Sequence, residues 1–163
     1  MKVRLLIADD NPTVRKLLRT LLETQTDWQV CGEAENGVEA VAKAAELKPD
    51  VVILDLAMPV MDGLHAALEI SSASPGIPIL MNTMHYFEGL DLEAKKVGIR
   101  RVLNKSHSAD ELLAAIHEAL KPALQQQADT GLAQAAAQNC STTSNGAVDP
   151  PATGNTDPNT EPN

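Results

Sequence analysis

Short apolar runs alternate with amphipathic segments along residues 1–124. Continuous apolar runs are typical of strands covered on both faces, and here they predict strands at 3–8, 29–33, 51–54, 77–81 and 101–104. A helix is expected to follow each strand. The positions expected to face the core are Val14, Leu17, Leu18, Leu21 and Leu22 in the first helix, Val38, Val41, Ala42 and Ala45 in the second, Leu64, Ala67, Leu68 and Ile70 in the third, and Leu112, Leu113, Ile116 and Leu120 in the fifth.

Capping signals set the expected ends of several helices. Pro12 opens the first helix, and Asp62-Gly63 starts the third. Gly98 is expected to end the fourth helix, at 90–97, while Ser108 caps the fifth as part of a capping box. Because strands and helices alternate, the sequence predicts an α/β fold. We expect a doubly wound parallel five-stranded sheet, (βα)5, in the flavodoxin-like order 2-1-3-4-5.

The composition changes near residue 125. Beyond Lys121 the sequence has no Lys or Arg, and it becomes rich first in Gln and Ala and then in Ser, Thr, Asn, Gly and Pro. Such a segment buries too little apolar surface to offset its chain entropy. We therefore expect one domain at 1–124 and a low-complexity, disordered C-terminal tail at 125–163.

Charge and cysteine content narrow the class of protein. The formal net charge is −9, which argues against direct DNA binding. Cys31 and Cys140 have no disulfide-framework spacing, as is typical of a reduced, cytoplasmic protein. No apolar run is long enough for a membrane span, and the first residues do not resemble a signal peptide. The sequence thus predicts a cytoplasmic protein without a membrane partner.

An acidic, hydroxyl-bearing or basic residue stands at the carboxyl end of four of the five strands. Asp9-Asp10 follows the first strand, Asp55 the third, Thr83 the fourth and Lys105 the fifth. Parallel strands place their carboxyl ends at one edge of a sheet, so these side chains are expected to meet there. Each residue alone has an ordinary explanation, such as a helix cap or a solvated strand end. Their combination, in that order, is improbable by chance.

Three neighbouring carboxylates repel one another, and a hard divalent cation such as Mg²⁺ relieves that repulsion. In this arrangement Asp55 can attack phosphorus to form an aspartyl phosphate. Lys105 supplies a positive charge to one phosphoryl oxygen, and the Thr83 hydroxyl can donate a hydrogen bond to another.

Three segments carry a family resemblance: 6–10 (LIADD), 52–63 (VILDLAMPVMDG) and 103–105 (LNK). They resemble the signature segments of response-regulator receiver domains of two-component systems. The resemblance implies phosphorylation of Asp55 and Mg²⁺ binding by Asp9, Asp10, Asp55 and the backbone carbonyl of Ala57. It also implies that Thr83 and Lys105 bind the phosphoryl group, which a histidine kinase or histidine phosphotransfer protein donates.

The sequence is most similar to receivers that usually precede a helix-turn-helix output domain, which is expected to be absent here. We therefore expect a stand-alone receiver that signals to a downstream protein target through a changed interaction surface. A homodimer through helix four, strand five and helix five is one form of that output. We expect no enzyme activity beyond self-phosphorylation and dephosphorylation at Asp55.

Three positions depart from the family pattern. Met84 stands where the family has a small residue, and it either restricts access to the site or swings out to solvent. Val102 replaces a frequent aromatic residue, and Ser106 a frequent proline. Two alternatives remain at this point. An aspartate-nucleophile phosphatase needs a second acid at the position of Ala57. A constitutive binding module needs Met84 to block the site.

Overall fold

The computed structural model describes residues 2–106 and 108–121. The elements are β1 (Val3–Ala8), α1 (Pro12–Leu22), β2 (Trp28–Ala34), α2 (Gly37–Leu47), β3 (Val51–Leu54), α3 (Gly63–Ala73), β4 (Ile79–Thr83), α4 (Leu90–Lys96), β5 (Ile99–Asn104) and α5 (Ala109–Leu120). All neighbouring strands are parallel, in the order β2-β1-β3-β4-β5. The predicted fold class and strand order are confirmed, whereas the predicted tail at 125–163 lies outside the described residues.

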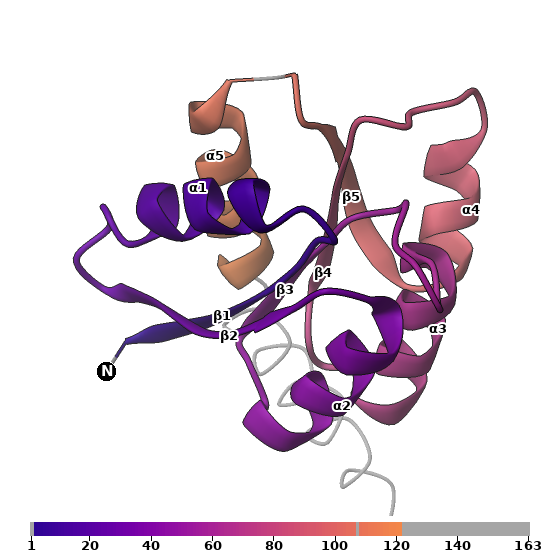
Figure 1. The fold of residues 1–163 in the computed structure, drawn as a ribbon, viewed down its shortest axis with the longest axis horizontal. Helices are drawn as coiled ribbons and strands as arrows, with labels where there is room; N and C mark the ends of the chain where they lie inside the picture. The colour runs from indigo at the N-terminus through magenta and orange to yellow at the C-terminus, as the bar shows by residue number, and fades with distance from the viewer. Residues whose placement is uncertain (1, 107, 122–163) are drawn as a thin grey trace, which may run out of the picture. The chain divides into compact units, whose positions relative to one another are not determined.

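Helices cover both faces of the sheet, with α1 and α5 on one face and α2, α3 and α4 on the other (Figure 1). Successive side chains of a strand point to opposite faces. In β1, Leu5 and Ile7 therefore pack with α1 and α5, whereas Leu6 and Ala8 pack with the other three helices. Burying one such aliphatic side chain contributes roughly 1.5–3 kcal/mol. Two aliphatic layers thus fix the sheet that carries the site.

The predicted helix faces were wrong in part. Leu17 is 68% exposed, and Val38 and Leu68 are also exposed, although all three were expected to face the core. In α2 the buried residues are Gly37, Ala40 and Ala44. Val38, Ala42 and Ala45, which were expected to be buried, are exposed. The reason is close packing. A Cβ on Gly37 would lie 2.5 Å from the Met61 carbonyl oxygen, so only small residues fit on this face of α2.

Element boundaries differ from the prediction by one or two residues. β4 begins and ends two residues later than the predicted 77–81, and its last residues are Asn82 and Thr83. β5 begins at Ile99, and α4 ends at Lys96, with Gly98 at φ +92° just beyond the cap. Ser108 occupies the N-cap position of α5, but its side chain makes no capping hydrogen bond, contrary to expectation. Within the described ranges, none of the helices combines the length and apolar character that a bilayer span requires.

Candidate functional site

Three carboxylates gather where β1 and β3 end. The two strands are neighbours, with Ala8 paired to Leu54, and the Asp55 amide donates to the Ala8 carbonyl at 2.8 Å. This register brings Asp9, Asp10 and Asp55 together, with one oxygen of each lying within 4.8 Å of the others. Carboxylate oxygens are the ligands that Mg²⁺ prefers, and Asp10 is exposed, so the group suits a cation that keeps some of its waters.

The two inner carboxylates are nearly inaccessible, because Asp9 is 1% and Asp55 5% exposed. Each is fixed by a backbone amide. Asp9 Oδ1 accepts a hydrogen bond from Asn11 N at 3.0 Å, and Asp55 Oδ1 accepts one from Leu56 N at 2.7 Å. Burial raises the pKa of Asp9, and the nearby Lys105 offsets only part of that rise. The site therefore holds buried negative charge at an energetic cost.

Lys105 supplies the internal counter-charge. Its Nζ lies 2.6 Å from Asp9 Oδ2 and 2.8 Å from Asp55 Oδ2. Burial lowers the pKa of Lys105, but the two carboxylates outweigh burial, so that its pKa is raised overall. Three carboxylates and one ammonium leave a net charge of −2. One divalent cation would balance that charge.

Thr83 is fully buried at the end of β4, beside this group in the sheet order. Its carbonyl accepts a hydrogen bond from the Lys105 amide at 3.0 Å, while its Oγ1 accepts one from His85 N at 3.0 Å. The Thr83 hydroxyl is thus tied to the loop between β4 and α4. Met84, the next residue, is 61% exposed, so its side chain is turned to solvent rather than packed into the site.

The loop between β3 and α3 approaches Asp55 closely. The amide of Gly63 donates to the Leu56 carbonyl at 2.9 Å, and a Cβ on Gly63 would lie only 2.1 Å from the Asp55 carbonyl oxygen. Ala57, the expected carbonyl ligand, lies in the same loop. Val60 has φ +68°, and Met61 N donates to the Pro59 carbonyl across it at 2.7 Å. This tight turn is strained for a β-branched residue.

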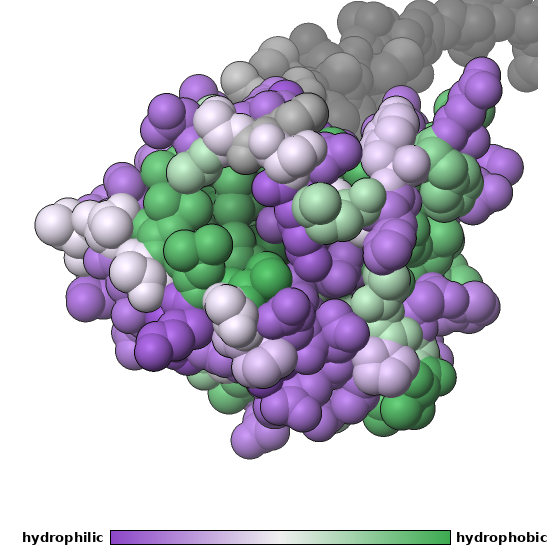
Figure 2. Space-filling view, turned by 45° about the horizontal axis from the view of Figure 1, so that its top comes forward, coloured by the Kyte–Doolittle hydropathy of each residue, from purple (hydrophilic) through white to green (hydrophobic). Residues whose placement is uncertain are grey.

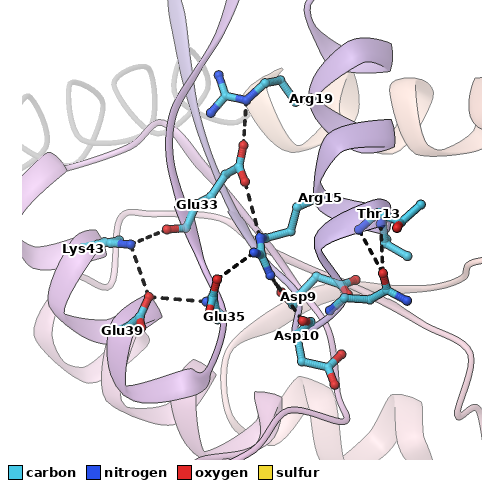
Figure 3. Close-up of polar contacts among 11 residues, drawn as sticks. Asp9, Asp10, Thr13, Arg15, Arg19, Glu33, Glu35, Glu39 and Lys43 are labelled. Atoms are coloured by element: carbon cyan, nitrogen blue, oxygen red, sulfur yellow. Dashed lines mark hydrogen bonds and ion pairs between the residues drawn. The ribbon is translucent and has the colours of Figure 1, made fainter.

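Sequence reasoning missed Arg15, a buried cation next to Asp9 and Asp10 (Figure 3). Its Nη1 donates to the carbonyls of Asp9, at 2.7 Å, and Asp10, at 3.3 Å. Its Nε and Nη2 bond to Glu33 and Glu35. A signal did exist, because Arg15 shares the buried face of α1 with Leu18 and Leu22, where an arginine is unexpected unless it is paired.

An apolar groove of about 250 Å³ opens beside Lys105. It runs between α1 and α5, and Figure 2 shows it as a hollowed apolar patch. Its apolar lining consists mainly of leucines, namely Leu17, Leu18, Leu21, Leu103 and Leu112. The exposure of Leu17 is thus explained by its position on the wall of this groove.

The chain is similar to proteins of one family along most of its length. A family model for the response regulator receiver domain matches residues 5–117. The chemotaxis protein CheY of Listeria monocytogenes is 38% identical over 119 residues, which cover 73% of this chain and 99% of that protein. The transcriptional regulatory protein YxjL of Bacillus subtilis is 38% identical over 120 residues, which cover 74% of this chain and 55% of YxjL.

A solved structure shows the same likeness in three dimensions. The response regulator domain of Thermotoga maritima CheB has a TM-score of 0.69 to this chain at 33% sequence identity, and the match covers 74% of this chain and 97% of that one. The residues that the family model matches include all three clustered carboxylates, Thr83 and Lys105. The resemblance identified from the three sequence segments is therefore confirmed, and the chain belongs to the response regulator receiver domain family.

Proposed function

We propose that this receiver domain accepts a phosphoryl group on Asp55 in a Mg²⁺-dependent reaction. The donor is a histidine kinase or a histidine phosphotransfer protein. One observation carries the proposal: the buried Asp55 carboxylate lies next to two further carboxylates and 2.8 Å from the ammonium of Lys105. A nucleophilic oxygen, a cation-binding group and a positive charge for a phosphoryl oxygen are thus within reach of one another.

In the proposed reaction, Asp9, Asp10, Asp55 and the carbonyl of Ala57 hold Mg²⁺, which neutralises charge on the transferring group. One Asp55 carboxylate oxygen forms a bond to phosphorus as the bond from phosphorus to the donor nitrogen breaks. Lys105 then turns from the carboxylates toward a phosphoryl oxygen. Thr83, whose hydroxyl oxygen now accepts from His85 N, donates its own proton in a hydrogen bond to another phosphoryl oxygen.

The proposed output is a changed surface for a downstream protein. Moving the Thr83 hydroxyl disturbs its bond to His85, and the loop that follows carries the exposed Tyr86 and Phe87. Leu92 on α4 is also exposed, so the surface has apolar side chains that a partner can cover. The partner is a target protein or, through α4, β5 and α5, a second copy. The proposal also includes stand-alone action in the cytoplasm without direct DNA binding.

The test is phosphorylation by acetyl phosphate, followed by intact-protein mass spectrometry. We expect the parent chain to gain one phosphoryl group with Mg²⁺ and none with EDTA. Asp55→Asn should gain none. Asp50→Asn is a matched control, since Asp50 precedes the same strand at its opposite end and should leave labelling unchanged.

Equal labelling of the parent and Asp55→Asn would refute Asp55 as the acceptor. If neither protein gained a phosphoryl group, the constitutive binding module would be the better description of the chain.

A further inference from the structure

We propose that Arg15 is a positioning residue of the metal site. It anchors the main chain of Asp9 and Asp10 and so sets the direction of their carboxylates. The inference rests on the proposed function, because it assigns a role in cation binding to a residue that would not touch the cation.

The geometry of the guanidinium is the first observation. Nη1 reaches two consecutive carbonyls, those of Asp9 and Asp10, while Nε and Nη2 bond to Glu33 at 3.3 Å and Glu35 at 2.8 Å. Arg15 thus joins the turn after β1 to the end of β2 (Figure 3). The planar fork of arginine can make these bonds together, whereas a lysine ammonium is a single point of contact.

Hydrogen bonds around Asn11, at the start of α1, hold the same turn. Asn11 caps α1, and its side chain accepts hydrogen bonds from the amides of Thr13 and Val14. The Asn11 amide in turn donates to Asp9 Oδ1, and the amide of Arg15 donates to the Asn11 carbonyl. The helix start therefore fixes the Asp9 side chain, while the Arg15 side chain fixes the carbonyls of both acids.

Charge balance is the second observation. A buried cation beside a cation-binding site would oppose metal binding if it stood alone. Here Glu33 and Glu35 accept from Arg15, so the three residues together carry a net charge of −1. Glu33 is itself held by Arg19, whose Nε lies 2.6 Å from Glu33 Oε1, and its carbonyl accepts a hydrogen bond from Lys43. Arg19 and Lys43 are paired in turn with Glu23 and Glu39, so the whole network carries a net charge of −1 and places no net positive charge near the carboxylates.

Metal affinity depends on how well the ligands are oriented before the ion arrives. Loss of an outer contact that orients ligands typically costs 10- to 100-fold in metal affinity. Removing Arg15 frees two adjacent carbonyls at the point where two of the three carboxylates are attached. We therefore expect Arg15→Met to weaken Mg²⁺ binding by about tenfold or more.

The experiment is a calorimetric titration of the full chain with Mg²⁺, comparing the parent, Arg15→Met, Arg15→Lys and Arg19→Met. Arg19 is the matched control. It lies one turn further along α1 and, like Arg15, bonds to Glu33. Its other bond goes to Glu23 and not to a carbonyl of Asp9 or Asp10, so Arg19→Met should keep the parent affinity within about twofold. Arg15→Lys retains the charge and should fall between the parent and Arg15→Met.

A second readout separates positioning from a general loss of structure. The rate of acetyl phosphate labelling is measured against Mg²⁺ concentration. We expect Arg15→Met to need about tenfold more Mg²⁺ for half its maximal rate, while the rate at saturating Mg²⁺ stays near that of the parent. Partial unfolding would instead lower the amplitude at every Mg²⁺ concentration.

Equal Mg²⁺ affinity in the parent, Arg15→Met and Arg15→Lys would overturn the inference and leave the proposed function intact. Equal weakening in Arg15→Met and Arg19→Met would also overturn it, because the effect would then belong to the ion pairs with Glu33. A parent chain that binds no Mg²⁺ would overturn the proposed function and this inference with it.

Discussion

Replacing Lys105 with methionine should destabilise the fold unless a divalent cation is present. The change keeps the apolar stem but removes the ammonium between Asp9 and Asp55, two carboxylates that are almost fully buried. Removing one partner of a buried ion pair typically costs 3–5 kcal/mol. The Lys105 side chain retains 14% exposure and Asp10 is exposed, so water reaches part of the site. We expect the lower end of that range, about 3 kcal/mol at pH 7.

The loss should shrink as the pH falls. Burial already raises the pKa of Asp9 above its usual value of 3.8, and removal of Lys105 takes away the contacts that lower it. An acid whose pKa is raised by folding binds its proton more tightly in the folded state. Stability therefore increases as the pH falls through the folded pKa toward 3.8 and decreases as the pH rises. The gap between Lys105→Met and the parent should thus be smaller at pH 5 than at pH 7.

Mg²⁺ should also close much of the gap, because the cation replaces the missing counter-charge. Ligand at 100 times its Kd stabilises a folded protein by about 2.7 kcal/mol. Lys105→Met has no competing ammonium at Asp9 and Asp55, so it should bind Mg²⁺ more tightly than the parent and gain more from a given concentration. The parent gains stability from Mg²⁺ as well, so the gap closes only by the ratio of the two Kd values. A fall from about 3 to about 1 kcal/mol requires the variant to bind Mg²⁺ roughly 30-fold more tightly than the parent.

Urea unfolding followed by the fluorescence of Trp28 measures these differences. Trp28 is the only tryptophan, and it is buried at the start of β2, the opposite end of that strand from the site. Lys16→Met, an exposed change on α1, is the control and should lie within about 0.5 kcal/mol of the parent. The reasoning is refuted if Lys105→Met costs no more than this control in EDTA, or if Mg²⁺ leaves its loss unchanged.

Two further predictions concern the loop between β3 and α3. Val60→Gly should raise the free energy of unfolding by about 0.5–1 kcal/mol, because glycine adopts a positive φ without strain. The Val60 side chain is 86% exposed, so its removal loses little packing. A urea midpoint at or below that of the parent would contradict this prediction. Gly63→Ala should cost about 3 kcal/mol, since its Cβ would lie 2.1 Å from the Asp55 carbonyl oxygen. Gly76→Ala, where a Cβ meets nothing within 4 Å, is its control, and equal urea midpoints for the two variants would count against the close approach.

The sequence was enough to predict the sheet and the place where the acids meet. The alternation of strands and helices predicts a parallel sheet, and the expected flavodoxin-like order makes the first and third strands neighbours. Asp9, Asp10 and Asp55 were therefore expected to emerge together, as they do. The approach of Lys105 to that edge followed in the same way. The distances from Lys105 to Asp9 and Asp55 could not be predicted from the sequence, because the position of a flexible side chain depends on the charges around it.

Helix faces and buried cations were harder to predict, for a common physical reason. Hydrophobicity assigns Val38 to the side of α2 that faces the core. The loop at Met61 lies so close to that side, however, that only Gly37 and other small residues fit there. Hydrophobicity likewise assigns Arg15 to solvent, yet two glutamates and two carbonyls satisfy it in a buried position. Both outcomes depend on residues distant in the sequence, whereas periodicity reports only on local neighbours.

The charge of the site argues for a divalent cation rather than for protonation. Three carboxylates and Lys105 leave a net charge of −2, and burial raises the pKa of Asp9, so added positive charge at the site would be favourable. Protonation of these carboxylates would reduce the repulsion among them. A protonated carboxyl oxygen, however, is a poor nucleophile and a poor metal ligand. A monovalent cation would leave one negative charge uncompensated. Mg²⁺ would balance the charge without protonating the oxygens, as the proposed attack of Asp55 on phosphorus requires.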